Sequence, residues 1–169
     1  MRTTTSVSRR PARGALIALI TGAGLVLTPV AAQASGGGTA PPVAAPASVV
    51  APTAAAQVAV DTALAQQGKP YVWAGAGPSS YDCSGLTQFA YRAAGIELPH
   101  SSRMQSAIGT PVARADLQPG DLVFFYEPVG HVGIYIGNGQ MVHAPTSGDV
   151  VKVASIDVMG SITAMRRLG

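Results

Sequence analysis

The chain has 169 residues, a length typical of one domain, and its 11 basic and 8 acidic residues give a formal net charge of +3. Four of the basic residues but none of the acidic ones precede residue 35, so the part that follows carries 7 − 8 = −1. That part offers no cluster of Lys and Arg for phosphate groups, which excludes nucleic-acid binding, and the single cysteine excludes an internal disulfide.

Residues 1–34 have the pattern of a signal peptide. A stretch with four arginines comes first, the apolar run 14–30 follows, and Ala32-Gln33-Ala34 supplies small residues at the spacing of a signal-peptidase site. The alternative is a retained membrane anchor, but two glycines and a proline interrupt the run, which is shorter than the roughly 20 residues that span a bilayer. We therefore expect a secreted or wall-associated protein that leaves the membrane after cleavage. The pair Arg9-Arg10 leaves the general and the twin-arginine routes of export open.

Residues 35–53 are rich in Gly, Ala, Pro, Ser and Thr and carry no charge. Such a composition cannot bury a core, so we expect a disordered spacer. The remaining residues, 54–169, are expected to form one globular domain without internal repeats.

The first half of this domain is predicted to be helical. A helix is expected over 54–67, ended by Gly68, and a second helix is expected to follow the N-cap residue Asp82 and to end at Ala94 before Gly95. Apolar residues at three- and four-residue spacing give the second helix one inward face. Three shorter elements complete this half: an extended piece at 71–73, a loop at 74–80 and a helical turn at 102–107.

The second half is predicted to be β structure. Strands are expected at 122–126, 131–136, 140–143, 150–153 and 162–166. Helices followed by consecutive strands, without crossover helices, indicate an α+β fold with an antiparallel sheet of about five strands.

The loop between two of these strands decides whether His131 and His143 lie on one face of the sheet. A two-residue turn would pair Ile134 with His143 and put the histidines on opposite faces. A three-residue loop, 137–139, would pair Gly133 with His143 and make the histidines diagonal neighbours on one face. We expect the three-residue loop if the histidines work together.

Cys83 follows a loop and begins a predicted helix, and two histidines come much later in the chain. Nucleophilic catalysis at an acyl carbon requires a thiol, a base and a group that orients the base. A helix N-terminus carries about half a positive charge, which is expected to lower the pKa of a cysteine there. A buried structural cysteine is the alternative, but its neighbours would be apolar rather than Asp and Ser-Gly. A zinc site with His131 and His143 matches no short ligand spacing.

Six short blocks follow one another across nearly the whole domain: Tyr71-Val72-Trp73, Asp82-Cys83-Ser84-Gly85-Leu86, Leu98-Pro99-His100-Ser101-Ser102, Pro119-Gly120-Asp121-Leu122-Val123-Phe124-Phe125, Gly130-His131-Val132-Gly133-Ile134-Tyr135-Ile136-Gly137 and Met141-Val142-His143-Ala144. Together they resemble the NlpC-type family of bacterial cell-wall cysteine peptidases. The resemblance implies a compact papain-like α+β fold in which the nucleophile begins a helix packed on the sheet. It also implies cleavage of peptidoglycan stem peptides between D-γ-glutamate and the diamino acid that follows, without a cofactor or a metal.

The resemblance implies that Cys83 is the nucleophile, His131 the base and His143 the residue that orients His131. The alternative for His131 is a strand-edge histidine without a catalytic role, and the alternative for His143 is an ordinary surface histidine. His100 is a weaker candidate for a base, because only one is needed.

Five further residues are expected to contact the substrate. Tyr71 and Asp82 match residues that hold the free amine of the stem peptide's L-alanine, although Asp82 also suits an N-cap and Tyr71, like Trp73, is expected to lie partly in the core. Ser101 and Ser102 match a segment that lines the groove. The fifth residue is Ser84. Its backbone N–H, like that of Cys83, is expected to donate a hydrogen bond to the oxyanion.

One position departs from the family pattern, and two alternative functions stay open. Ala74 stands where the family usually has Gly, and its methyl group is expected to narrow the groove or shift the loop without abolishing activity. The first alternative is an amidase or a transpeptidase on the same fold. The second is a non-catalytic wall-binding or regulatory protein, against which the complete set of Cys83 and two histidines argues. A monomer is expected.

Overall fold

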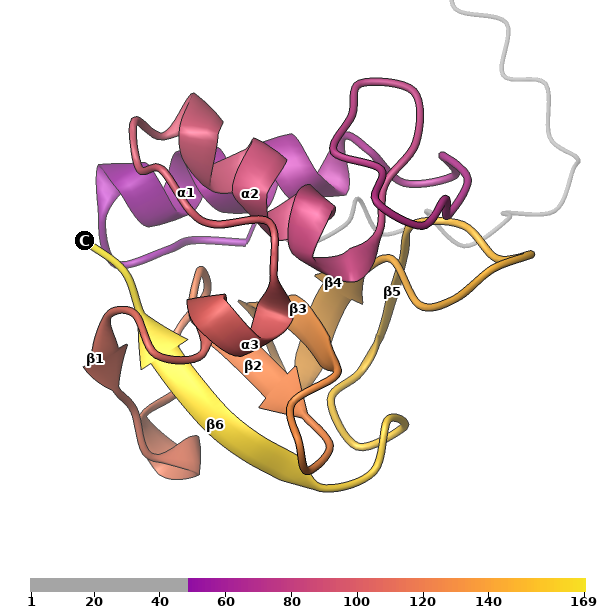
Figure 1. Cartoon of the computed structure of the whole chain (residues 1–169). Helices are drawn as coiled ribbons and strands as arrows, with labels where there is room; N and C mark the ends of the chain where they lie inside the picture. Colours follow the sequence, from indigo (N-terminus) through magenta and orange to yellow (C-terminus); the bar gives the residue numbers. More distant parts are fainter. Residues whose placement is uncertain (1–48) are drawn as a thin grey trace, which may run out of the picture. The chain divides into compact units, whose positions relative to one another are not determined.

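The computed structural model describes residues 49–169 as three helices, a short 3-10 helix and one sheet (Figure 1). The expected signal peptide, 1–34, and most of the expected spacer, 35–53, lie outside these residues. Val49, at the end of the expected spacer, packs against the core, and its carbonyl accepts a hydrogen bond from the Gln57 side chain at 3.0 Å. In the described part of the chain, no helix has the length and apolar character needed to cross a membrane.

The first helix, α1 (Ala54–Leu64), begins after Thr53, whose hydroxyl accepts the N–H of Ala56 at 3.1 Å. It ends earlier than the predicted boundary at residue 67. The reason is a tertiary contact, because the backbone N–H of Gly68 donates to the carbonyl of Val151 at 2.9 Å. The chain leaves the helix to meet the sheet.

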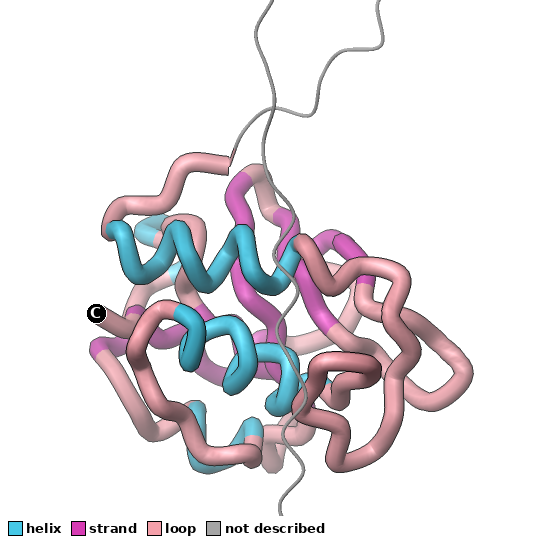
Figure 2. The backbone as a smooth tube through the Cα atoms, turned by 90° about the horizontal axis from the view of Figure 1, so that it is seen from above, coloured by secondary structure: helices cyan, strands magenta, loops and turns pink. Residues whose placement is uncertain are grey.

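The second helix, α2 (Cys83–Ala93), has the predicted N-cap and C-terminal stop. The Asp82 carboxylate accepts the N–H of Gly85 at 2.7 Å, and Gly95 takes a φ of 79° just after the helix. A third helix, α3 (Ser102–Gln105), occupies the predicted helical turn. Figure 2 shows α1 and α2 side by side above the strands.

Six strands form one antiparallel sheet in the order β1-β6-β2-β3-β4-β5. They are β1 (Thr110–Pro111), β2 (Leu122–Phe125), β3 (His131–Gly137), β4 (Gln140–His143), β5 (Lys152–Ser155) and β6 (Ile162–Arg167), and the 3-10 helix η1 (Arg114–Asp116) lies between β1 and β2. The five longer strands correspond to the predicted ones. The sixth, β1, has only two residues and pairs with the end of β6, which is why no alternating pattern revealed it.

The predicted strand at 150–153 begins two residues later in the structure. Val150 pairs with Pro70, and the Val151 N–H donates to the Lys69 carbonyl at 2.8 Å. These two residues therefore bind the loop before α2 rather than β4.

The hairpin between β3 and β4 has a two-residue turn, not the predicted three-residue loop. Asn138 and Gly139 have φ of 53° and 70°, the positive values that a type I′ turn requires. Gly137 therefore lies opposite Gln140. The register shifts just before this pair, which makes Ile136 the extra residue of a β-bulge.

The bulge puts both histidines on one face of the sheet, which the three-residue loop was expected to do. Beyond it, Ile134 pairs with Val142, so Gly133 faces His143. His131, two residues from Gly133, then lies on the same face of the sheet as His143. The prediction was wrong about the turn and correct about the shared face.

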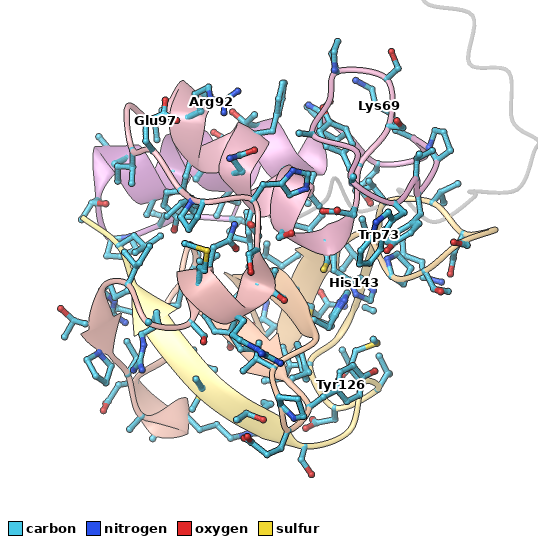
Figure 3. All side chains as sticks on the ribbon, viewed as in Figure 1. Lys69, Trp73, Arg92, Glu97, Tyr126 and His143 are labelled. Atoms are coloured by element: carbon cyan, nitrogen blue, oxygen red, sulfur yellow. The ribbon has the colours of Figure 1, made fainter. Side chains whose placement is uncertain are left out.

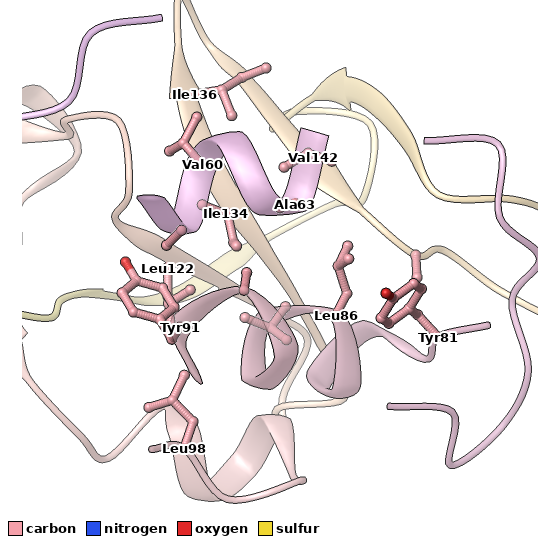
Figure 4. Packing of buried hydrophobic residues seen from close by; sticks show 14 of the residues in the cluster. Val60, Ala63, Tyr81, Leu86, Tyr91, Leu98, Leu122, Ile134, Ile136 and Val142 are labelled. Atoms are coloured by element: carbon pink, nitrogen blue, oxygen red, sulfur yellow. The ribbon is translucent and has the colours of Figure 1, made fainter. Parts of the chain in front are cut away.

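The main core lies between the two long helices and the sheet. Figure 4 shows residues of both helices, among them Val60 and Leu86, packed against Ile134 and Val142 of the sheet. A smaller cluster, formed by Val123, Phe125, Met141 and Ile156, covers the face of the sheet that carries the histidines. The packing of α2 on the sheet brings the first turn of this helix near the start of β3.

Candidate active site

Cys83 is the first residue of α2, and Asp82 before it holds two loops against the start of this helix. The Asp82 carboxylate accepts the backbone N–H of Ala74 at 3.0 Å and the hydroxyl of Ser84 at 3.1 Å. The His100 ring nitrogen Nε2 lies 2.9 Å from both oxygens of the same carboxylate. Asp82 is therefore an N-cap, as predicted, and also the residue that joins the loop before α2 to the loop before α3.

A buried glutamine holds the first turn of α2 from the other side. The Gln105 amide donates to the carbonyls of Ser84 at 3.0 Å and Pro99 at 2.8 Å, and it accepts the hydroxyl of Thr87 at 2.7 Å. Gln105 is fully buried with all of these bonds made. Sequence reasoning missed this residue because a single Gln at the end of a short helical turn gives no pattern.

Close approach to the preceding loop also places Cys83. The Asp82 N–H donates to the Gly75 carbonyl at 2.8 Å, and a β-carbon at Gly85 would lie 1.9 Å from that carbonyl oxygen. Only glycine fits at this contact, so the loop can lie directly against the helix N-terminus.

The Cys83 thiol has a raised pKa. Burial is the main cause, the negative Asp82 adds to it, and backbone N–H groups of Val132, Ser84 and Cys83 itself oppose it. The predicted lowering by the helix N-terminus is thus outweighed by burial. The resting residue is a thiol, and it needs a nearby base to become a nucleophile.

His131 and His143 form a hydrogen-bonded pair on the face of the sheet. His131 Nε2 lies 2.9 Å from His143 Nδ1, and the ring planes are 83° apart. Burial and the neighbouring His143 lower the pKa of His131 from 6.5 to about 3. Burial and the nearby Lys152 lower the pKa of His143 to about 4, so both rings are neutral near pH 7.

The neutral pair restricts the positions of the protons. If His131 accepts a proton through Nδ1, its Nε2 carries a hydrogen and donates it to His143 Nδ1. His143 then carries its own hydrogen on Nε2, which is buried and has no hydrogen-bond partner among the described residues. His143 is therefore in the position that the orienting residue takes in a set of nucleophile, base and orienting group.

Seven of the eight predicted site residues line one cavity of about 310 Å³. These are Tyr71, Asp82, Cys83, Ser84, Ser101, Ser102 and His131. The eighth, His143, lies behind His131 and lines a neighbouring cavity. Larger cavities of about 530 and 860 Å³ lie elsewhere on the described part of the chain, but no cysteine or histidine lines either of them.

Two further residues, His100 and Trp73, line this cavity in ways that the sequence did not indicate. His100 forms part of the wall and lies within hydrogen-bond distance of the Asp82 carboxylate. Trp73 is 81% exposed and forms part of the wall, so its expected place in the core is wrong, whereas Tyr71 is half-buried and packs against the core as predicted. Figure 3 labels Trp73 near His143 on one side of the domain.

Ala74 takes a backbone conformation that favours the Gly usually found at this position in the family. Its φ of 59° lies in the left-handed region, where glycine has no steric cost and alanine has one. Its N–H still reaches the Asp82 carboxylate. The methyl group is accommodated at the cavity wall at the cost of local strain.

No group of three or more His, Cys, Asp or Glu side chains is placed to hold a metal ion within residues 49–169. The zinc alternative therefore gains no geometric support from this part of the chain.

The family model described as the NlpC/P60 family matches residues 68–167. The chain belongs to the NlpC/P60 family. Two proteins named probable endopeptidases are similar to it: one from Mycobacterium tuberculosis is 52% identical over 108 residues, and one from Corynebacterium glutamicum is 46% identical over 123. These matches cover 64% and 72% of the chain but only 28% and 59% of the relatives, so the chain spans a part of their length.

The fold agrees with solved NlpC/P60 structures. The NlpC/p60 domain of the peptidoglycan hydrolase SagA superimposes with a TM-score of 0.62 at 34% identity, covering 67% of this chain and 98% of that one. The α+β fold expected from the resemblance is therefore confirmed, with six strands in place of about five.

Proposed function

We propose that this chain is an exported cysteine endopeptidase that hydrolyses peptidoglycan stem peptides. The observation that carries the proposal is that Cys83 and His131 line one cavity while His143 binds the far nitrogen of His131. The names of the relatives, probable endopeptidases and a peptidoglycan hydrolase, support the same activity.

In the proposed reaction, His131 takes the Cys83 proton as the sulfur attacks the amide carbonyl. The backbone N–H groups of Cys83 and Ser84 belong to the first turn of α2, which leaves them free of helix hydrogen bonds and able to stabilise the oxyanion. The carbon–nitrogen bond then breaks, and His131 gives its proton to the leaving amine. Water hydrolyses the thioester and restores the thiol.

In the proposed reaction, the Cys83 proton moves to His131 during the attack on the carbonyl and not before the substrate binds. The raised pKa of Cys83 and the lowered pKa of His131 both favour the neutral pair before substrate binds. The imidazolium that forms during attack is stabilised by His143, which accepts its Nε2–H. The driving force for proton transfer therefore comes from formation of the carbon–sulfur bond.

The proposed substrate bond joins D-γ-glutamate to the diamino acid that follows. Asp82 supplies a carboxylate at the cavity wall for the free ammonium of L-alanine, and Tyr71 lies beside it. Ser101 and Ser102 line the same cavity and offer hydroxyl groups to the peptide. Asp82 is already held by His100, so the substrate ammonium would share this carboxylate with the histidine.

Export is part of the proposal and rests on residues 1–34. Their basic start, apolar run and Ala32-Gln33-Ala34 site support cleavage and release to the cell wall. N-terminal sequencing of the protein recovered from culture medium tests this point, since the mature chain is expected to begin at Ser35.

The test of function is digestion of purified peptidoglycan by residues 35–169, with mass spectrometry of the released peptides. The expected product is the free L-Ala–γ-D-Glu dipeptide, released by the wild type and absent with Cys83→Ala. Release of intact stem peptides would indicate an amidase, and new cross-links would indicate a transpeptidase. Equal digestion by Cys83→Ala would exclude Cys83 as the nucleophile.

A further inference from the structure

A second cavity of about 680 Å³ adjoins the cavity of Cys83. The two share Gly130, His131 and Pro145, so they meet at the histidine proposed as the base. The other residues that line the second cavity include one charged pair, Asp149 and Lys152. The function proposed above uses no residue of this second cavity except the two histidines.

The sheet register places a lysine beside the catalytic pair. Lys152 is the direct cross-strand partner of His143, and His143 lies diagonally opposite His131, so the three residues form a row across β3, β4 and β5 on one face. The Lys152 side chain is 45% exposed and forms an ion pair with Asp149 at the cavity wall. Both charges also act on the pKa of His143: Lys152 lowers it, and Asp149 has a smaller, opposite effect.

An aromatic residue under strain forms another part of this wall. Tyr126 has a φ of 73°, unfavourable for any residue with a side chain, and the residue is nearly half exposed. Val158 and Met159 add apolar surface. Figure 3 labels Tyr126 and His143 on the same side of the domain. The cavity thus combines an apolar wall with one anion and one cation held close together.

The direction of the reaction assigns the two cavities to the two halves of the substrate. Asp82 and Tyr71 lie in the first cavity and suit the acyl half, which bears the free ammonium. His131 must reach the leaving nitrogen to protonate it, so the departing half has to lie beside His131 but away from Asp82. The second cavity meets this requirement, because His131 forms its boundary with the first.

On the basis of the function proposed above, we propose that the second cavity binds the departing diamino acid through the far end of its side chain. Lys152 binds a carboxylate there, and Asp149 binds the neighbouring ammonium. A ligand with both groups replaces the ion pair between Asp149 and Lys152 by two matched contacts, whereas a ligand with the ammonium alone leaves Lys152 without a new partner. The cavity therefore selects a diaminopimelate-type residue over a lysine-type one.

The test compares two soluble peptides, L-Ala–γ-D-Glu–meso-diaminopimelate and L-Ala–γ-D-Glu–L-Lys, which differ by one side-chain carboxylate. The wild type is expected to show a kcat/KM about three- to fivefold higher for the diaminopimelate peptide, the range of an exposed ion pair. In Lys152→Met this ratio is expected to fall to about 1, and in Lys152→Arg, which keeps the cation, to remain above 1.

The matched control is Arg92→Met, which also removes one cation. Arg92, on α2, pairs with Glu97 beyond the end of this helix and lines neither cavity. Figure 3 labels both residues far from His143 in that view. Its ratio is expected to equal that of the wild type. Folding of each variant is checked by thermal unfolding, since Lys152 is exposed and its loss leaves the core intact.

The outcomes separate this inference from the function on which it rests. If the wild type cleaves both peptides at the same kcat/KM, or if Lys152→Met slows both by the same factor, Lys152 acts only through the charge on His143 and the inference is overturned. If the wild type cleaves neither peptide and Cys83→Ala behaves identically on peptidoglycan, the proposed function fails and the inference with it. A ratio that falls only in Lys152→Met supports it.

Discussion

At the scale of single residues, the site depends on side chains that each serve two purposes. Asp82 is the N-cap of α2, anchors the loop of Ala74 and binds His100. It also lines the cavity. Its substitution would disturb the helix start and the substrate contact together, so a loss of activity there would not separate the two roles. The histidine pair is a cleaner case, because a single hydrogen bond joins the two rings and neither histidine caps a helix.

The two histidines are predicted to differ in their effect on turnover. His131→Ala removes the base, and kcat is expected to fall to background, by at least about 10²-fold. His143→Ala removes only the hydrogen bond that orients His131, and kcat is expected to fall about 10-fold with little change in KM, which stopped assays on either peptide would measure. His143→Gln, which can still accept a hydrogen bond, serves as the matched control and is expected to recover part of the loss. Full activity in His143→Ala would mean that another residue orients His131.

At the scale of elements, the contact between α2 and the loop before it sets the position of Cys83. This contact depends on Gly85, because the Gly75 carbonyl occupies the space where a β-carbon would lie. The neighbouring contact with α3 depends on Gln105, whose amide bonds to the carbonyls of two segments. Neither residue lines the cavity of Cys83, yet both help to determine where Cys83 lies.

Gly85→Ala is predicted to reduce both stability and activity. The new methyl group would lie 1.9 Å from a backbone oxygen, so the loop or the helix must shift, at a cost of about 1–3 kcal/mol in the free energy of unfolding. Urea unfolding measures the cost, and kcat/KM on the soluble peptides is expected to fall by more than stability alone explains. Gly133→Ala is the comparison, since its methyl group would meet only side-chain atoms of Met141, the nearest being the sulfur at 2.6 Å, rather than a backbone carbonyl, and is expected to cost less. Equal effects of the two changes would argue against a special role for the loop contact.

At the scale of the whole molecule, the site adds a pH-dependent term to the stability of the fold. The pKa of His131 is lowered to about 3 and that of His143 to about 4, both from 6.5. A group with a lower pKa in the folded state binds protons more readily after unfolding. The stability that it contributes is therefore complete above about pH 6.5 and is lost as the pH falls toward 4 and then 3.

The free energy of unfolding is predicted to decrease below pH 6.5, by at most about 1.4 kcal/mol per pH unit for each of the two histidines. Urea unfolding of the wild type at pH 7, 6 and 5 measures this slope. The double variant His131→Asn, His143→Asn is expected to have a shallower slope over the same range, because the groups that titrate differently are gone. Parallel slopes would mean that the buried pair does not control acid stability.

Much of the fold and most of the site follow from local patterns. The cap at Asp82, the stop at Gly95 and the five longer strands agree with prediction, because each depends on a few neighbouring residues. The end of α1 and the start of β5 do not, because the Gly68 N–H donates to the Val151 carbonyl and the Val151 N–H donates to the Lys69 carbonyl across the fold. The places where prediction failed are those where a distant partner takes a backbone group.

The sequence alone determined the residue types of the site, the order of the elements and the resemblance that names the family. Only the tertiary structure decided that a β-bulge at Ile136, rather than a longer loop, brings His131 and His143 to one face. It also decided that burial raises the pKa of Cys83 and that Lys152 joins the row of histidines. The physical reason is that register, burial and charge proximity depend on residues far apart in the chain, whereas caps, turns and motifs depend on their neighbours.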